Sequence, residues 1–349
     1  MNRYLTLIIL LFFSATGIFG QNVSNKKTAV MHQEYVDSLK KTPYEWRLPI
    51  LGSQVRRKGF DIPYPNGIMI NYVMANQDVT LENLAVGLSP DELTDVSSIA
   101  RFESISPHIN VINLRYDFWL LPFLNLYALG GYVDSKSDIK LALPFAAEFT
   151  SNGKGPSVGW GVAVAGGLGP LFVSSNYNMV WTYLPQLESP ALAQVFDIRL
   201  GHTFQFRKYP QSNLSIMLGA QYQKLSPESK GQVDLSTLTG MTPEKKEEAL
   251  GQLDDWYYDL PESQQDRLSD FHGAMSGWLS NEEGTILHYS FNKKLYYPWS
   301  ATAGLNYQIN KRYILMVMYT FLGSRDQLVV SFNYRFGIKG KNVLAGTTL

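Results

Sequence analysis

Hydrophobic and polar residues alternate one by one along many short segments of this chain. In 299–310 the odd positions carry apolar residues from Trp299 to Ile309, and the even positions carry only polar or small residues. In 327–336 the same alternation is interrupted only at Val329. Successive side chains of a β-strand point to opposite faces of the sheet, so each segment predicts a strand with one apolar and one polar face.

Similar segments recur through the chain after residue 65. Most have about 9–11 residues or slightly more, the length that a tilted transmembrane strand requires. Lipid offers no partner for an unpaired strand edge, and bacterial barrels favour even strand numbers. We therefore expect an all-β protein, a closed antiparallel transmembrane β-barrel of about 10–12 strands with a helical loop insertion. The further candidate strands are 66–76, 107–119, 123–133, 156–168, 170–183, 194–207, 213–224, 285–296 and 313–322, with 139–150 as a weaker one and 285–309 as either one bent strand or two.

The connections between these segments differ in length. Some are short, as periplasmic turns tend to be, and the others are longer, as surface loops tend to be. This difference predicts periplasmic turns at 121–122, 169–170, 208–212 and 310–312. It predicts outer loops at 77–106, 134–155, 184–193 and 225–284.

Two of the long connections contain signals for the start of a helix. Ser89 offers an N-cap, and Glu92 stands at the capping-box position. Thr242 precedes a proline and a glutamate at the start of a longer helix, and Pro261 begins another. The insertion 240–280 is longer than an ordinary connection and predicts a lid, a plug or a docking surface. A solvated loop with no role beyond protection is the alternative.

The two ends of the chain differ from its middle. Residues 1–20 carry one basic residue, an apolar run and then small residues, the layout of a secretory signal peptide that the mature protein lacks. Residues 21–65 have little strand character and predict a periplasmic or lumen-filling segment. The barrel is expected over 66–337, followed by a tail over 338–349.

Composition excludes several classes of function. The chain has no cysteine, so it can form no disulfide, no thiolate metal site and no lipid anchor on an N-terminal cysteine. It carries 30 basic and 30 acidic side chains, and this balance argues against a nucleic-acid partner, which requires a basic patch. The histidines show no metal-ligand spacing and no glycine-rich segment precedes a helix, so neither a metal nor a cofactor is expected.

Charged residues occur on the polar faces of several strands. If the apolar faces meet lipid, these charges point into the lumen, where they can pair or meet water. Two interpretations remain open: a constriction that selects solutes by charge, or paired charges that plug and stiffen a narrow barrel. Small residues on one face of 157–167 leave room for a ligand or for such a plug. The predicted lumen-lining and selectivity residues are Arg115, Asp117, Asp197, Arg199, Arg207 and Arg335.

One pair of residues fits a different class of function. His288 and Ser290 share one strand face, which brings an imidazole beside a hydroxyl, the minimum for a base-activated nucleophile. Outer-membrane phospholipases and lipid A deacylases carry a similar His-x-Ser pair. No acidic residue compels the choice of a third member, and Asn292 is a weak candidate. Alternation turns all three toward the lumen, whereas a lipid hydrolase needs its pair to face the membrane, so we expect no enzymatic activity.

Two stretches resemble uncharacterised, porin-like or transporter-like outer-membrane barrels of Gram-negative bacteria. One is 114–127, and the other runs from Pro298-Trp299 through Asn310-Lys311-Arg312 and Gly323-Ser324-Arg325 to Tyr334-Arg335-Phe336. The resemblance implies fold and location, the cell outer membrane after signal-peptide cleavage. The partners expected there are the lipid bilayer, lipopolysaccharide and the barrel-insertion machinery. Barrels of this kind usually end on an aromatic residue that the machinery reads, whereas thirteen residues follow Phe336 here.

The function that these features favour is passive or facilitated passage of a small solute or amphiphile, gated or capped by the helical insertion. A surface-exposed structural or adhesion barrel is the alternative if the lumen is sealed. An outer-membrane lipid hydrolase that uses His288 and Ser290 is the third possibility.

Overall fold

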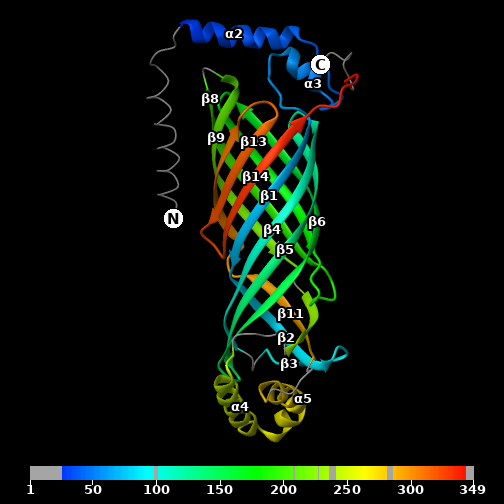
Figure 1. Cartoon of the computed structure of the whole chain (residues 1–349), viewed down its shortest axis with the longest axis vertical. Coiled ribbons are helices and arrows are strands. Elements are labelled where there is room, and N and C mark those ends of the chain that lie inside the picture. The colour runs from blue at the N-terminus through cyan, green and yellow to red at the C-terminus, as the bar shows by residue number, and fades with distance from the viewer. Residues whose placement is uncertain are drawn as a thin grey trace.

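The computed structural model describes residues 26–97, 101–206, 209–226, 228–235, 241–280 and 286–342. Within them, ten strands close into an antiparallel barrel (Figure 1), which confirms the predicted fold class. The order around the barrel is β1–β14–β13–β12–β9–β8–β7–β6–β5–β4, so each strand has two hydrogen-bonded neighbours. The barrel strands are β1 (Asn66–Gln77), β4 (Arg101–Leu121), β5 (Leu124–Leu143), β6 (Ala147–Leu168), β7 (Leu171–Thr182), β8 (Ala191–Phe206), β9 (Tyr209–Leu225), β12 (Trp299–Gln308), β13 (Tyr313–Phe321) and β14 (Arg325–Phe336).

Both ends of the described chain lie at one end of the barrel, called the terminal end below (Figure 1). The turns at this end are short: only two residues join β4 to β5, and two join β6 to β7. In the second turn Gly169 has a φ of 62°, a conformation that residues with a side chain rarely adopt. The opposite end of the barrel carries the long connections and is called the cap end.

Two predicted strand segments have a different place in the structure. The segment 285–296 forms β11 (Ile286–Leu295), which belongs to a second sheet outside the barrel. The weaker candidate 139–150 is no separate strand, because β5 and β6 meet there in a hairpin. These two strands therefore continue through 134–155, which the sequence assigned to a loop.

The extension of β5 and β6 through 134–155 was not predicted from the sequence because of the residues on their outward faces. Beyond the membrane-facing part, outward positions carry charges instead of apolar residues, so the alternation of hydrophobic and polar positions disappears. Opposite charges face each other across the two strands, with Lys154 Nζ 2.6 Å from Asp134 Oδ2 and Lys140 Nζ 3.0 Å from Glu148 Oε1. The two strands remain hydrogen-bonded in this region, although the alternation of hydrophobic and polar residues is lost.

A second, four-stranded sheet stands on the cap end of the barrel. Its order is β10–β11–β2–β3, with β10 (Glu228–Asp234), β2 (Val79–Ser89) and β3 (Glu92–Asp95) around β11. The helix predicted from Ser89 is wrong, because 89–92 is a tight turn between β2 and β3. The backbone N–H of Asp91 donates to Ser89 Oγ at 3.4 Å, so the serine stabilises a turn instead of a helix start.

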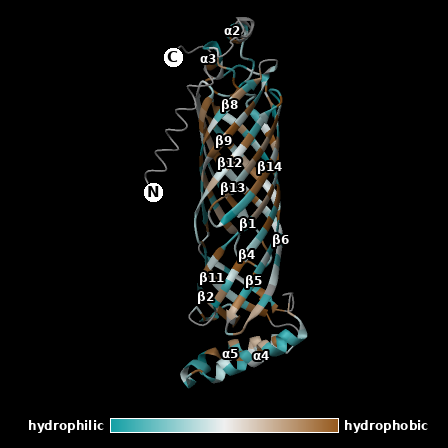
Figure 2. Ribbon diagram, turned by 90° about the vertical axis from the view of Figure 1, so that its left-hand side faces the viewer, coloured by the Kyte–Doolittle hydropathy of each residue, from teal (hydrophilic) through white to brown (hydrophobic). Residues whose placement is uncertain are grey.

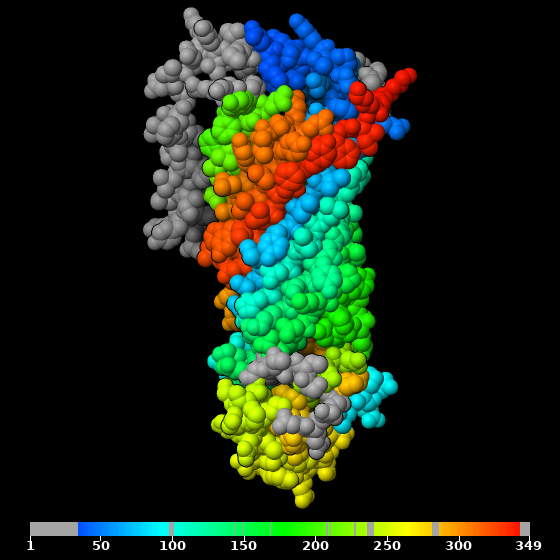
Figure 3. All heavy atoms as spheres, in the orientation of Figure 1, coloured from blue at the N-terminus to red at the C-terminus, as the bar shows by residue number. Residues whose placement is uncertain are grey.

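Two helices, α4 (Pro243–Tyr258) and α5 (Glu262–Leu279), occupy the insertion and cover the cap end (Figure 3). Thr242 is the N-cap of α4, and its side chain accepts a hydrogen bond from the N–H of Lys245. Leu253 and Leu268 are fully buried between the helices and the second sheet. The predicted helical insertion is thus confirmed as a packed unit, called the cap below. No helix in the described ranges is both long and apolar enough to cross a membrane.

The outer surface of the barrel is apolar across a band between two groups of aromatic residues. Hydrophobic and hydrophilic positions alternate along the strands that form this band (Figure 2). Exposed aromatic side chains flank it toward the terminal end at Phe204, Phe206, Tyr209, Tyr307 and Tyr313, and toward the cap end at Tyr72, Tyr132, Trp299 and Tyr319. An apolar band between aromatic girdles is the surface of a transmembrane β-barrel. Exposed apolar side chains within it include Ile70, Leu114, Ile198, Leu218, Leu305, Leu315 and Val330.

The segment before the barrel lies across its terminal end. It contains α2 (Lys26–Lys41) and α3 (Gly52–Arg57) (Figure 1). None of its described residues lines the cavity inside the barrel. The start of the tail holds it there, because the side-chain amide of Asn342 donates to the carbonyl oxygens of Trp46, Arg47 and Pro49 at 2.9–3.2 Å. The predicted signal peptide and the last seven residues of the tail lie outside the described residues.

Candidate functional site

The lumen of the barrel contains a cavity of about 910 Å³. It reaches from polar side chains near the terminal end to Phe271 and Trp278 of the cap. Its volume lies in the range of about 300–1,000 Å³ that is typical of small-molecule sites. Arg207 lies outside the described residues. The other five predicted lumen residues all line this cavity: Arg115, Asp117, Asp197, Arg199 and Arg335.

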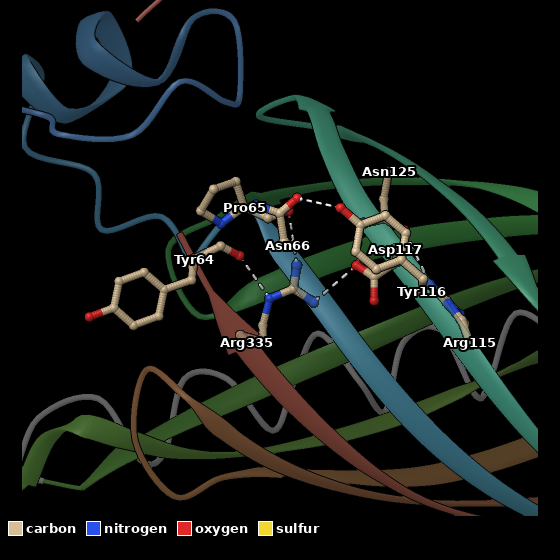
Figure 4. Close-up of polar contacts among 8 residues, drawn as sticks. All are labelled: Tyr64, Pro65, Asn66, Arg115, Tyr116, Asp117, Asn125 and Arg335. Atoms are coloured by element: carbon tan, nitrogen blue, oxygen red, sulfur yellow. Dashed lines mark hydrogen bonds and ion pairs between the residues drawn. The ribbon is translucent and has the colours of Figure 1, made fainter. Parts of the chain in front are cut away.

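At the terminal end, Arg335 of β14 connects strands on both sides of β1 (Figure 4). Its Nη1 lies 3.1 Å from Oδ1 of Asp117 on β4. Its Nε donates to the carbonyl oxygen of Tyr64 at 2.8 Å, and its Nη2 donates to that of Pro65 at 3.4 Å. Asp117 also accepts a hydrogen bond of 2.7 Å from Nδ2 of Asn125. The side chains of Arg335 and Asp117 are only 6% and 1% exposed, so each charge depends on these partners.

The same set of contacts continues across the lumen from β4 to β8. The guanidinium of Arg115 lies 3.6 Å from the ring centroid of Tyr127. The Tyr127 hydroxyl donates to Oδ1 of Asn176 at 2.7 Å, and Nδ2 of Asn176 donates to Asp197 at 3.2 Å. Asp197 forms an ion pair of 2.8 Å with Arg199.

These polar side chains fill the terminal end of the lumen and are called the terminal network. Arg115 joins its two halves, because Nη2 of Arg115 donates to Oδ1 of Asn125 at 3.1 Å. Its charges are held in pairs or against an aromatic ring, which favours the interpretation of a plug in a narrow barrel over an open charged constriction. The members are Arg115, Asp117, Asn125, Tyr127, Asn176, Asp197, Arg199 and Arg335.

Small residues on the inner face of β6 make room for the terminal network. A Cβ atom at Gly161 would lie 2.2 Å from Cζ of Tyr127, so the ring occupies the space that the missing side chain leaves. At this position the small face predicted over 157–167 accommodates the plug.

Substitution of Gly161 by alanine is expected to lower the free energy of unfolding by about 1–3 kcal/mol, the usual effect of overpacking. The added methyl group must displace the Tyr127 ring from its bond with Asn176. Urea unfolding of the barrel in lipid vesicles measures the change.

Gly166→Ala is the matched control, since it lies on the same strand and no atom lies within 4 Å of its added Cβ. Its stability should equal that of the unchanged chain. Equal stability of both variants would mean that Gly161 does not fix the position of Tyr127.

Toward the cap end, the wall of the cavity is mainly apolar. Where the barrel meets the second sheet, Val79, Ile105 and Leu295 are buried and pack with Leu81, Phe102, Ile139 and Leu225; these seven residues are called the junction cluster. Above them the cap contributes apolar side chains, among them Phe271, Met275 and Trp278. The cavity is thus polar at its terminal end and mainly apolar at its cap end.

Two cationic residues of the cavity wall were not singled out from the sequence. Lys293 lies on β11 and Arg325 begins β14, and both line the cavity. The signal for Lys293 was present, because it shares a strand face with Phe291 and Leu295. That face was assigned to lipid, whereas β11 lies outside the membrane band and turns its apolar face inward to the cavity.

The same reversal affects the pair His288 and Ser290. Leu287, Tyr289 and Phe291 line the cavity, so the predicted inward orientation of His288 and Ser290 is wrong. The Nδ1 atom of His288 is buried and has no hydrogen-bond partner, so no third member orients this ring nitrogen. Among the described residues, no group of three or more His, Asp or Glu side chains is arranged to hold a metal ion.

Comparison with known proteins gives a likeness of fold and no assignment to a family. No family model and no curated protein matches the sequence. The translocator domain of autotransporter NalP from Neisseria meningitidis is similar over 89% of this chain and 95% of that one, with 11% identity and a TM-score of 0.34. The outer membrane protein OprG from Pseudomonas aeruginosa is similar over 80% and 100%, with 9% identity and a TM-score of 0.34.

A third similar structure is the Pseudomonas putida toluene transporter TodX. The similarity covers 78% of this chain and 90% of that one, with 9% identity and a TM-score of 0.27. These structural neighbours are outer-membrane β-barrels, and at this level of identity the likeness concerns the fold alone.

Proposed function

We propose that this protein is an outer-membrane barrel that mediates the passage of a small apolar or amphiphilic molecule through its lumen. The observation that carries the proposal is the cavity of about 910 Å³, whose wall is apolar toward the cap end. An apolar wall with a few polar groups is typical of sites that bind small organic molecules. Short turns lie on the periplasmic side of outer-membrane barrels. In the proposed orientation the terminal network therefore faces the periplasm, and the cap faces the outside of the cell.

The two ends of the lumen favour gated passage over an open pore. The terminal network fills one end with paired charges, and the buried core between the cap helices and the second sheet covers the other. The second sheet shares no strand ladder with the barrel in the described residues. The cap and this sheet can therefore move away from the barrel without breaking barrel pairing, which makes them the proposed gate.

Uptake of a neutral apolar dye, N-phenyl-1-naphthylamine, by cells that produce the barrel tests this function. The dye crosses an intact outer membrane slowly, so cells with the barrel should show faster uptake. Val111 and Val133 are cross-strand partners that face the cavity. The double variant Val111→Trp, Val133→Trp fills the lumen between them, and its uptake rate should fall to that of cells without the barrel.

The matched control uses the next residues of the same two strands. Ile112 and Tyr132 are also cross-strand partners, but they are 58% and 50% exposed on the lipid-facing surface. The double variant Ile112→Trp, Tyr132→Trp should keep the uptake rate of the unchanged barrel. If both double variants fold and take up the dye equally fast, the lumen is not the route and the proposed function fails.

A further inference from the structure

The charges that line the lumen are out of balance. Among the described residues, five cationic and two acidic side chains line the cavity: Arg115, Arg199, Lys293, Arg325, Arg335, Asp117 and Asp197. Both carboxylates belong to the terminal network, where Asp117 pairs with Arg335 and Asp197 pairs with Arg199. The described lining therefore carries a formal net charge of three positive units, and none of the described carboxylates lines its apolar half.

Lys293 faces this apolar half without an acidic partner among the described residues. The only contact of its ammonium shown there is with the ring of Phe291, whose centroid lies 5.2 Å away. The nearby carboxylates of Asp78 and Glu82 do not line the cavity, and they contact Ser106 and Lys294 instead. Burial lowers the pKa of Lys293, because the charged form loses its water.

Arg325 is the second cation of this region. Its Nη1 donates to Oε1 of Gln223, and its Nε is buried without a hydrogen-bond partner. Arg325 pairs with Gln77, the last residue of β1, and Lys293 pairs with Leu81 near the start of β2. The two pairing positions are separated by about 13 Å of extended chain, at roughly 3.3 Å for each residue. Both cations therefore stand where the barrel meets the second sheet, beside the junction cluster.

We infer that the ligand of this cavity is an anionic amphiphile with a single acidic headgroup and an apolar tail. The headgroup binds at Lys293 and Arg325, and the tail lies against the junction cluster and the cap. A buried cation without a partner is unfavourable, and a bound carboxylate supplies charge-assisted hydrogen bonds to it. This inference rests on the proposed function, since it names the class of molecule that the lumen takes up.

Protection of a cysteine in the cavity tests the inference directly. The chain has no cysteine, so the variant Ile139→Cys places one thiol in the junction cluster, against which the tail is proposed to lie. The full-length barrel in lipid nanodiscs is treated with the small neutral reagent methyl methanethiosulfonate. The rate of labelling is measured with increasing dodecanoate, dodecanol or dodecyltrimethylammonium. The variant Asp134→Cys, at an exposed position outside the lumen, reports any effect of these compounds on the reagent itself.

Dodecanoate should protect the thiol at a concentration about tenfold or more below that of dodecanol, because it alone supplies an anion. Dodecyltrimethylammonium should protect least. The additional changes Lys293→Gln and Arg325→Gln should raise the dodecanoate midpoint about tenfold and leave the dodecanol midpoint unchanged. Lys294→Gln is the matched control, since Lys294 is the exposed next residue of β11 and pairs with Glu82.

The outcomes separate this inference from the proposed function. If dodecanol and dodecanoate protect equally well, the cavity binds amphiphiles but their charge does not matter, and the inference is overturned. The same conclusion follows if the glutamine variants bind dodecanoate as tightly as the unchanged barrel. If none of the three compounds protects the thiol, the cavity does not bind amphiphiles and the proposed function fails as well.

Discussion

Asp117→Ala is expected to lower the free energy of unfolding of the barrel by about 3–5 kcal/mol, because it leaves the buried charge of Arg335 without its acidic partner. The two carbonyl oxygens that also accept from Arg335 solvate the guanidinium but carry no full charge. Urea unfolding in lipid vesicles measures the effect, and the temperature at which the folded band is lost on a gel provides a second readout.

Two further variants identify the buried charge as the cause. Asp134→Ala removes an exposed ion pair with Lys154 and should leave stability unchanged, since exposed pairs contribute little. The double variant Asp117→Leu, Arg335→Met should recover much of the stability that Asp117→Ala loses, because two apolar side chains need no partner. A double variant no more stable than Asp117→Ala would show that the unpaired charge is not what destabilises the barrel.

Steady ion conductance in planar bilayers is expected only when both closures of the lumen are removed. The first variant replaces the cap, 241–280, with a short flexible linker, and the second changes Arg115 and Tyr127 to alanine. Each variant alone should remain silent, because the closure at the other end is intact. The combined variant should show discrete current steps, since a path through the cavity then connects both ends.

Other conductance results would contradict specific parts of this prediction. Conductance of the cap deletion alone would show that the terminal network does not seal the lumen. Conductance of the unchanged chain would make the protein an open pore and remove the need for a gate. Silence of the combined variant, if it is folded and inserted, would contradict the assignment of the two closures.

The membrane-spanning part of the fold was predictable because lipid imposes a simple rule on it. Outward residues there must be apolar, so strands such as 299–310 and 327–336 stand out by alternation alone. The rule ends where the membrane ends. On β5 and β6 beyond that limit, the outward faces carry ion pairs and the strands are no longer visible in the sequence.

Outside the membrane, the apolar face of a strand can point inward instead of outward. In β11 the apolar face points to the lumen and the polar face points away, so the same alternation places Lys293 inside and His288 outside. A pattern of period two fixes which residues share a face, but it does not say which face is the inner one. Only the position of the strand relative to the bilayer decides this, and one sequence does not contain it.

The candidate site was predictable to a similar extent. Charges on the polar faces of spanning strands led to Arg115, Asp117 and Asp197, since a charge on a lipid-exposed strand has only the lumen to face. The neutral members Asn125 and Asn176 carried no such signal, because amides are common on any polar strand face. Their role depends on which side chains meet across the lumen, and strand pairing determines that.

The position of Arg335 also has a consequence for barrel assembly. Its strand, β14, is the last to be synthesised, whereas its partners lie on β4 and in the residues just before β1. If β14 slipped by one residue against β1, every side chain would change faces and Arg335 would point to lipid, at a cost of about 2–4 kcal/mol at the midplane and less near the surface. A slip by two residues would keep it inside but carry it away from Asp117. The ion pair thus favours the correct register of β14 against β1 over registers shifted by one or two residues when the barrel closes.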